Sequence, residues 1–264
     1  MAVSTSETPG VVLVHGIRAS RSMWLAQLTA LGAAGVPAVA PDLPGHGGRR
    51  DEPFSVAGAL DAIEDAAGTL AGPLVVAGLS LGGYLAVHWA AHGRRRPDAV
   101  LAASCSTQPQ GAGLAAYTRL ARLIGRLPDG GAGLSDVLAR RVLPARALED
   151  LAVGGMSVAV MDNALAGMAG VDTLADLGAI DAPVWLVNGQ WDHFRTQERR
   201  FLRACDDGRL LIVPRATHLV SLVAPVAFNR ILLELVEHVR TAPARQPEDT
   251  RLSARAAPTR ARRR

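Results

Sequence analysis

Short apolar runs alternate with longer segments of helical periodicity along most of this chain of 264 residues, and this alternation constrains the fold more than any other feature. The runs are rich in β-branched residues and several end at glycine, as buried parallel strands do. They cover residues 10–16, 73–78, 98–104, 182–189 and 208–214, and a further strand with its Pro/Gly loop covers 36–47. Helical spacing of apolar residues covers 23–35, 55–70, 81–93, 195–205 and 222–240. The pattern predicts an α/β fold with a doubly wound, mostly parallel sheet.

One interval, residues 106–178, contains no convincing strand pattern. Its apolar residues follow short helical patterns broken by Gly/Pro turns, over residues 114–127, 134–143, 145–152 and 156–168. We therefore expect a helical cap or lid inserted between two core strands, with the α/β core formed by residues 1–105 and 179–240. Met156, Met161 and Met168 lie in this insertion. Because methionine adapts to irregular apolar surroundings, these side chains are expected either to form the core of the lid or to line an apolar acyl pocket.

The net charge of +4 and the sequence pI of about 10.0 reflect the C-terminus more than the body of the protein. Residues 241–264 hold seven arginines and two acidic residues and have no apolar periodicity, so we expect a disordered, Arg-rich tail there. The remaining residues are close to neutral. This distribution gives no reason to expect a nucleic-acid partner, and the expected partner is a small-molecule substrate. The oligomeric state is left open.

We expect neither a signal peptide nor a membrane span. The segment MAVSTSETPG has no basic region, and the apolar run that follows it, VVLV, is only four residues long. The two cysteines, Cys105 and Cys205, are too few for a disulfide framework. A reducing compartment is the default for such a chain, so we expect a cytoplasmic protein.

The pentapeptide Gly-Leu-Ser-Leu-Gly at residues 78–82 stands between a predicted strand and a predicted helix. A serine at such a junction sits on a sharp turn, the nucleophile elbow, with its hydroxyl raised at the carboxyl end of the sheet. Gly78 and Gly82 are needed because a β-carbon at either position would collide with the neighbouring element. Ser80 is therefore a candidate nucleophile, although five residues alone are weak evidence in a chain with 27 glycines.

A serine hydroxyl needs a base within hydrogen-bonding reach, and that base needs an acid to orient it. His218 follows the predicted strand 208–214 after a short loop, and Asp192 follows the predicted strand 182–189. Both positions lie at the carboxyl edge of the sheet, where open α/β sheets bind their ligands. The sequence therefore predicts a catalytic triad of Ser80, Asp192 and His218.

Two backbone N–H groups are expected to stabilise a developing oxyanion. His15 and Gly16 end the first predicted strand with a sharp turn, which allows the N–H of Ile17 to face the site. Leu81, directly after the serine, offers a second N–H at a helix N-terminus. His15 itself is expected to have a structural role that ties loops together.

Five motifs of the chain resemble those of the α/β-hydrolase fold superfamily, in its single-domain form with a small helical cap. The motifs are VLVHGIRASRSMW at 12–24, PDLPGHG at 41–47, GLSLGG at 78–83, NGQWD at 188–192 and ATHLVSLVAPVAFN at 216–229. The resemblance implies that Ser80 is the nucleophile, His218 the general base and then acid, and Asp192 its orienting partner, with Ile17 and Leu81 as the oxyanion-hole donors. It also implies that no cofactor or metal is needed.

The expected function is that of a serine hydrolase that cleaves carboxylic esters, thioesters or lactones of apolar acyl groups. Trp24 and the three methionines are the candidate substrate-binding residues. By the same resemblance, a serine at position 80 disfavours dehalogenation and epoxide opening, which use an aspartate there, and the single glycine of HGIR disfavours esterases of bulky alcohols. The same triad also serves C–C bond hydrolysis, perhydrolase and lyase chemistry, and such a fold can act as a non-catalytic ligand-binding module. The sequence leaves the substrate and these alternatives open.

Overall fold

A single parallel sheet organises the molecule. The computed structural model describes residues 8–111, 114–115, 118–119, 122–123, 126–127, 132–158 and 160–242. Within these residues six strands pair in the order β2-β1-β3-β4-β5-β6, and every neighbouring pair is parallel. The strands are β1 (Gly10–Val14), β2 (Ala38–Val39), β3 (Leu74–Leu79), β4 (Ala99–Ala103), β5 (Val184–Gly189) and β6 (Gly208–Val213). The predicted doubly wound α/β fold is confirmed.

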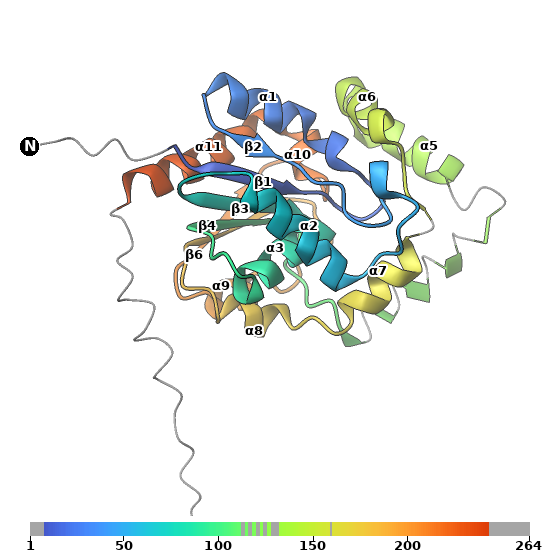
Figure 1. The fold of residues 1–264 in the computed structure, drawn as a ribbon. Helices are drawn as coiled ribbons and strands as arrows, with labels where there is room; N and C mark the ends of the chain where they lie inside the picture. The colour runs from blue at the N-terminus through green and yellow to red at the C-terminus, as the bar shows by residue number, and fades with distance from the viewer. Residues whose placement is uncertain are drawn as a thin grey trace, which may run out of the picture.

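Helices cover both faces of the sheet, which explains why its central strands are continuously apolar. Strands β1, β3, β4 and β5 are buried along their whole length. Successive side chains of a strand point to opposite faces, so Val12 and Val14 enter one core cluster while Val11 and Leu13 enter the other. One face packs against α1 (Leu25–Ala33) and α11 (Pro225–Thr241), and the opposite face packs against α2 (Val56–Gly68), α3 (Leu81–His92) and α9 (Glu198–Ala204) (Figure 1).

The direction of winding reverses between β1 and β3. From β1 the chain passes to β2 at one edge, and it then crosses back to β3 on the other side of β1. The connection after β1 therefore leads to α1 on one face, and the connection after β3 leads to α3 on the opposite face. Two connections that diverge in this way leave a crevice at the carboxyl ends of the strands, where open α/β sheets bind ligands. Ile17 and Ser80 lie on these two connections.

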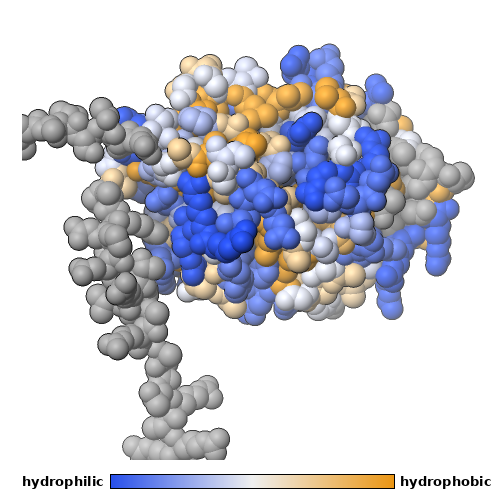
Figure 2. All heavy atoms as spheres, in the orientation of Figure 1, coloured by the Kyte–Doolittle hydropathy of each residue, from blue (hydrophilic) through white to orange (hydrophobic). Residues whose placement is uncertain are grey.

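Hydrophilic side chains cover much of the surface that faces the viewer, with smaller apolar areas between them (Figure 2). This agrees with helices that turn an apolar stripe toward the sheet and a polar face toward solvent. Among the described residues, no helix combines the length and the apolar character needed to cross a membrane.

The described residues between β4 and β5 are helical where they have regular structure. The helices are α5 (Ala132–Val142), α6 (Ala145–Gly154), α7 (Met161–Met168) and α8 (Thr173–Leu177). The first two agree with the predicted helices 134–143 and 145–152, whereas α7 begins later than the predicted helix 156–168. Most of the helix predicted over 114–127, and nearly all of the tail predicted over 241–264, lie outside the described residues.

Two differences from the predicted elements have simple local causes. The helix predicted over 222–240 is divided into α10 (Val220–Val223) and α11, because Pro225 has no N–H to continue a helix and instead occupies the first position of the next one. Helix α8 was not predicted, since five residues are too few to show an apolar period, although Asp172 caps it by accepting a hydrogen bond from the Ala175 N–H. Short 3-10 turns, η1 (Arg21–Trp24) and η2 (Gly47–Arg49), complete the described elements.

Candidate active site

Ser80 occupies a strained turn between β3 and α3. Its backbone angles are φ 57° and ψ −120°, a conformation that residues other than glycine rarely adopt. The flanking glycines are required sterically. A β-carbon at Gly78 would lie 2.1 Å from the carbonyl oxygen of Gly82, and one at Gly82 would lie 2.0 Å from the carbonyl oxygen of Val14. The turn therefore presses α3 against β1 and β3 and holds the serine at the strand ends.

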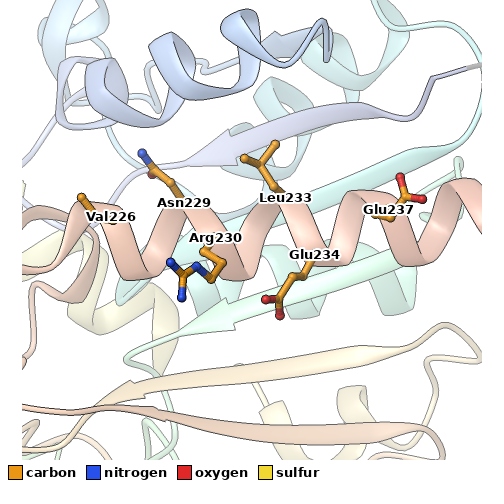
Figure 3. Close-up of a pocket in the computed structure, with 6 residues that line it drawn as sticks. All are labelled: Val226, Asn229, Arg230, Leu233, Glu234 and Glu237. Carbon is orange, nitrogen blue, oxygen red and sulfur yellow. The ribbon is translucent and has the colours of Figure 1, made fainter.

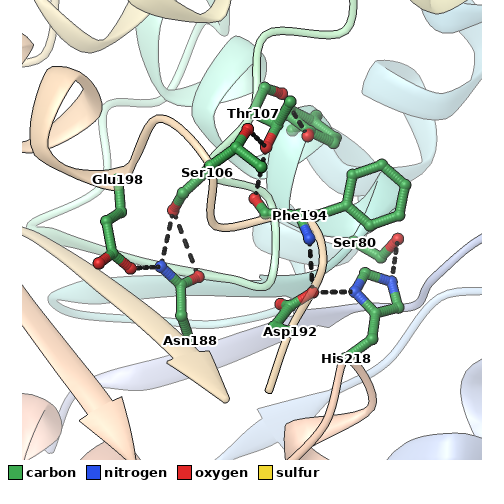
Figure 4. Close-up of polar contacts among 10 residues, drawn as sticks. Ser80, Ser106, Thr107, Asn188, Asp192, Phe194, Glu198 and His218 are labelled. Carbon is green, nitrogen blue, oxygen red and sulfur yellow. Dashed lines mark hydrogen bonds and ion pairs between the residues drawn. The ribbon is translucent and has the colours of Figure 1, made fainter. Parts of the chain in front are cut away.

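A chain of hydrogen bonds joins Ser80, His218 and Asp192 (Figure 4). The Ser80 hydroxyl donates to His218 Nε2 over 3.0 Å, and His218 Nδ1 donates to Asp192 Oδ1 over 2.9 Å. The serine follows β3, the aspartate follows β5 and the histidine follows β6, so three separate strand ends supply the three side chains. The sequence placed these residues at one edge of the sheet, and the structure brings them into contact there.

The environment of Asp192 keeps its buried carboxyl group ionised. Its side chain is fully buried, and Oδ1 also accepts a hydrogen bond of 2.8 Å from the Phe194 N–H. Burial by itself raises the pKa of a carboxyl group, but the hydrogen bond and charge of His218, together with the Phe194 N–H, outweigh that effect and lower the pKa of Asp192 below its usual value. The carboxylate is therefore charged at neutral pH and orients the imidazole of His218.

A polar network behind Asp192 fixes the loop that carries it (Figure 4). Asn188, at the end of β5, donates from Nδ2 to Glu198 Oε2 over 3.2 Å and to Ser106 Oγ over 3.1 Å. Thr107 Oγ1 donates to the carbonyl oxygen of Phe194 over 2.8 Å. The connection after β4 is thus tied to the connection after β5, which carries Asp192.

His15 has the structural place that the sequence predicted. It is completely buried, donates from Nδ1 to the Gly16 carbonyl over 2.9 Å, and accepts the Leu43 N–H at Nε2 over 3.0 Å. Burial, reinforced by neighbouring His46, lowers the pKa of His15 to about 4. A neutral ring at this position links the loop after β1 to the loop after β2.

The two backbone N–H groups expected to bind an oxyanion lie beside the serine. Ile17 and Leu81 line the same cavity as Ser80. Leu81 is the first residue of α3, so its N–H has no partner within the helix. Neither of the two N–H groups donates a hydrogen bond to another group of the described structure. Both are therefore available to an acceptor bound at Ser80.

The cavity at Ser80 has a volume of about 160 Å³ and mostly apolar walls. Helix α7 contributes Ala164, Leu165 and Met168, and Leu114 comes from the same insertion. The remaining lining residues, beyond those already named as candidates, are Tyr84, Thr107, Gln108, Pro109, His193 and Phe194. The sequence gives no signal that identifies this last group, because Tyr84 lies within a helical apolar pattern and the other five lie in irregular segments after β4 and β5.

Three of these missed residues contact the hydrogen-bond chain or its support. The rings of His193 and Phe194 lie 5.0 Å and 4.9 Å from the ring of His218, measured between centroids. Tyr84, in the first turn of α3, donates its hydroxyl to the Thr107 carbonyl oxygen. Burial raises the pKa of the Tyr84 phenol well above its usual value, so it remains a neutral donor.

The predicted substrate-binding residues are only partly brought together. Met168 lines the cavity, whereas Trp24, Met156 and Met161 are not among the described residues that do. Trp24 is completely buried in the core cluster on the α1 and α11 face, with its ring 5.9 Å from that of Phe228, so it packs the core and does not face a substrate. Met156 is 48% exposed, and Met161 is half-buried at the start of α7.

A second hollow, of about 650 Å³, lies along the outer surface of α11 (Figure 3). Its lining residues are Val226, Asn229, Arg230, Leu233, Glu234 and Glu237. None of them is a serine, cysteine or histidine, so the hollow offers no nucleophile or ring base. The cavity at Ser80, which has a serine and a histidine beside it, is therefore the better candidate for a reaction site.

Two groups of described side chains have the composition of a metal site: Asp192, His193 and His218, and separately His88, His92 and Asp176. In the first group the ring nitrogens of His218 are both engaged, one by Asp192 and one by Ser80. That arrangement fits proton transfer to and from a serine better than metal coordination.

Comparison with known proteins identifies the family of the chain. The model of the Alpha/beta hydrolase family matches residues 11–231, while a search of the curated proteins finds no match. Among solved structures, an esterase from Thermogutta terrifontis is 24% identical, with a TM-score of 0.70 over 90% of this chain and 92% of the other. An enol-lactonase from Burkholderia xenovorans LB400 is 19% identical, with a TM-score of 0.68 over 88% of this chain and 92% of the other.

A bromoperoxidase from Bacillus anthracis is 18% identical, with a TM-score of 0.74 over 88% of this chain and 93% of the other. At such identities these likenesses concern the fold alone, whereas the family model covers most of the sequence. The chain belongs to the alpha/beta hydrolase family.

Proposed function

We propose that this protein is a serine hydrolase that cleaves carboxylic esters, thioesters or lactones of apolar acyl groups through an acyl-enzyme on Ser80. The observation that carries the proposal is the continuous hydrogen-bond chain from Ser80 through His218 to Asp192. A serine in this arrangement is activated by its neighbouring base, and the base is held in one tautomer by the buried carboxylate.

The proposed reaction begins when Ser80 Oγ attacks the carbonyl carbon of the substrate and His218 Nε2 accepts the hydroxyl proton. The N–H groups of Ile17 and Leu81 stabilise the oxyanion of the tetrahedral intermediate, a contribution of several kcal/mol in related sites (about 2.7–4 kcal/mol per donor removed). His218 then protonates the leaving group. Water, deprotonated by the same ring, hydrolyses the acyl-enzyme and restores the serine. The proposal requires no cofactor or metal.

The size of the cavity supports a small apolar acyl or aryl group. A dry cavity of about 150 Å³ accommodates a benzene molecule, and the cavity at Ser80 is of similar volume. Its wall formed by α7 supports the proposal that the insertion, residues 106–178, acts as a cap that selects the acyl group. The free thiols of Cys105 and Cys205 are in keeping with a proposed cytoplasmic location.

A fluorophosphonate probe tests the nucleophile directly. We expect stoichiometric labelling of the wild-type protein at Ser80, loss of labelling in Ser80→Ala and His218→Ala, and full labelling in His92→Ala, whose histidine lies at the other end of α3. Folded wild-type protein that takes up no probe would instead favour a non-catalytic ligand-binding module.

A substrate panel then separates the chemistries. We expect hydrolysis of p-nitrophenyl esters, thioesters or lactones with a preference for acyl groups of up to about six carbons, which matches the benzene-sized cavity. No turnover across the whole panel, with Ser80 still labelled, would redirect the proposal to C–C bond hydrolysis, perhydrolase or lyase chemistry on the same triad.

A further inference from the structure

A second group of histidine and carboxylate side chains lies at the opposite end of α3 from Ser80. His88 and His92 are four residues apart and therefore project from the same face of the helix. Both rings reach Asp176 of α8. His88 Nδ1 lies 2.8 Å from Oδ2 of the carboxylate, and His92 Nε2 lies 2.7 Å from Oδ1. One ring nitrogen thus faces each carboxylate oxygen.

Asp176 lacks a permanently charged partner. Its side chain is only 6% exposed, and within the described residues its ion-pair partners are His88 and His92 alone. No arginine of that part of the chain lies within ion-pair distance of it. A buried carboxylate is costly unless it is paired with a cation or binds one. The cluster therefore combines two imidazole ligands with a buried carboxylate that has no arginine beside it among the described residues.

The geometry suits a single metal ion. The three ligand atoms lie within 4.8 Å of one another. Zinc bonds to nitrogen and oxygen are about 2.0–2.1 Å long, so neighbouring ligands of a tetrahedral ion are about 3.3 Å apart. The observed nitrogen-to-oxygen distances need to grow by only about 0.5 Å to admit the ion. The His92 side chain is 54% exposed, which leaves a route to solvent and room for a water ligand.

The turn of α8 that carries Asp176 is held by hydrogen bonds around Asp172. Asp172 caps α8 by accepting the Ala175 N–H over 3.2 Å, and Gln108 Nε2 donates to the same side chain over 2.7 Å. The Asp176 N–H donates to the Asp172 carbonyl over 2.9 Å. Helix α8 also packs closely on α3, so the two elements that carry the three side chains support each other.

We propose that His88, His92 and Asp176 form a binding site for a divalent transition-metal ion of zinc-like chemistry, which joins α3 to α8. Two imidazoles and one carboxylate with an open fourth position are a ligand set that such ions prefer. His88 lies about 12 Å along α3 from Ser80, at about 1.5 Å per residue. The bound ion therefore acts as a clip between the insertion and the core and takes no part in the chemistry at Ser80.

Titration of the metal-free, untagged full-length protein with Co²⁺ tests the site, because cobalt replaces zinc and gives visible absorption bands that report its ligands. We expect one equivalent to bind, zinc to displace it, and His92→Ala to weaken binding by about tenfold or more. Asp176→Asn is expected to weaken binding to a similar degree. His238→Ala, which removes another exposed helical histidine, and His218→Ala, which disables the other His/Asp group, should both leave binding unchanged.

Thermal or urea unfolding gives a second readout that does not depend on activity. Zinc at a hundredfold excess over its Kd should shift the unfolding equilibrium of the wild-type protein by about a hundredfold and leave that of His92→Ala unshifted. His92 is largely exposed, so this variant is expected to fold even if Asp176→Asn does not. The proposal is wrong if the wild type binds cobalt no better than His92→Ala, or if His218→Ala loses the ion and His92→Ala keeps it.

Discussion

Helix α3 has a histidine–carboxylate group near each end. The two groups share their residue types but differ in the elements that supply the residues, in their hydrogen-bond partners and in the presence of a cavity. At its start, His218 and Asp192 come from other strand ends and meet Ser80, which sits on a strained turn beside a cavity. At its end, His88 and His92 come from the helix itself and meet Asp176, without a hydroxyl between them. The proposed catalytic arrangement thus differs from the second group by a serine hydroxyl and a cavity, since both groups place a histidine beside an aspartate.

The largest expected effect separates the two ends by activity. Ser80→Ala and His218→Ala should lower kcat/KM for a hydrolysed ester by about 10⁴-fold or more, and Asp192→Asn by about 10⁴-fold, because these residues act as one unit. His92→Ala should change kcat/KM by less than about twofold, since its ring is about 12 Å or more along the helix from Ser80. Steady-state kinetics on purified, folded variants measures both. Equal losses of kcat/KM in His218→Ala and His92→Ala would contradict the assignment of the reaction to the Ser80 end of α3.

A second prediction concerns the steric demand at the start of α3. Gly82→Ala places a methyl group about 2.0 Å from the Val14 carbonyl oxygen, and should lower the free energy of unfolding by about 3 kcal/mol or more. Gly32→Ala in α1, where a β-carbon meets nothing within 4 Å, should raise it by about 0.5–1 kcal/mol. Urea denaturation measures both changes. A neutral Gly82→Ala would show that the turn at Ser80 is looser than the close contacts indicate.

A histidine outside both groups, His15, lies beside the start of α3. His15 lies fully buried under the start of α3, with its pKa lowered to about 4, whereas His88 and His92 are partly exposed. Between pH 6.5 and about 4 the unfolded chain binds a proton at residue 15 that the folded chain does not. Stability therefore falls as the pH falls through this window, by on the order of 3 kcal/mol from His15.

The variant His15→Gln isolates this contribution. It is expected to be less stable than the wild type at pH 7, because it loses buried hydrogen bonds, but its urea midpoint should depend less on pH between 6.5 and 4. The measurement is the pH dependence of the midpoint in the two proteins. Parallel curves would mean that His15 is not the group that makes this end of the molecule sensitive to acid.

The smallest expected effect lies in the cavity wall. Met168→Ala enlarges the cavity. It should raise the ratio of kcat/KM for an ester with a longer acyl group to kcat/KM for one with a shorter acyl group by about tenfold. Met156→Ala removes a methionine that is 48% exposed and does not line the cavity, so it should leave that ratio unchanged. Competition between two esters in one assay detects the shift. An equal response to both substitutions would place the acyl group elsewhere.

Much of this arrangement could be predicted from the sequence, because its determinants are local. A strand that is buried on both faces shows as a short apolar run, and a tight strand-to-helix turn shows as glycines at fixed distances from Ser80. The carboxyl ends of parallel strands meet at one edge, so Asp192 and His218 could be brought to Ser80 without knowledge of their contacts.

The parts that could not be predicted depend on contacts between distant segments. Trp24 is a candidate substrate-binding residue by sequence, but in the structure it is buried against Phe228 of α11. Phe194, whose N–H supports Asp192, carries no sequence pattern that reveals this role. The cluster at the end of α3 was also missed, since the His88 and His92 spacing is local but Asp176 lies on a helix too short to show a period.

The residues joined by the hydrogen bonds at Ser80 come from distant parts of the sequence, so these bonds can be used to follow folding. Ser80 and His218 are 138 positions apart, and their bond forms only when β3, β5 and β6 have all joined the sheet in register. Partly folded chains with native helices would retain far-UV signal and still be silent to an active-site probe. The rate at which such a probe reacts during refolding therefore reports the completion of the sheet, which a far-UV signal from the helices alone does not report.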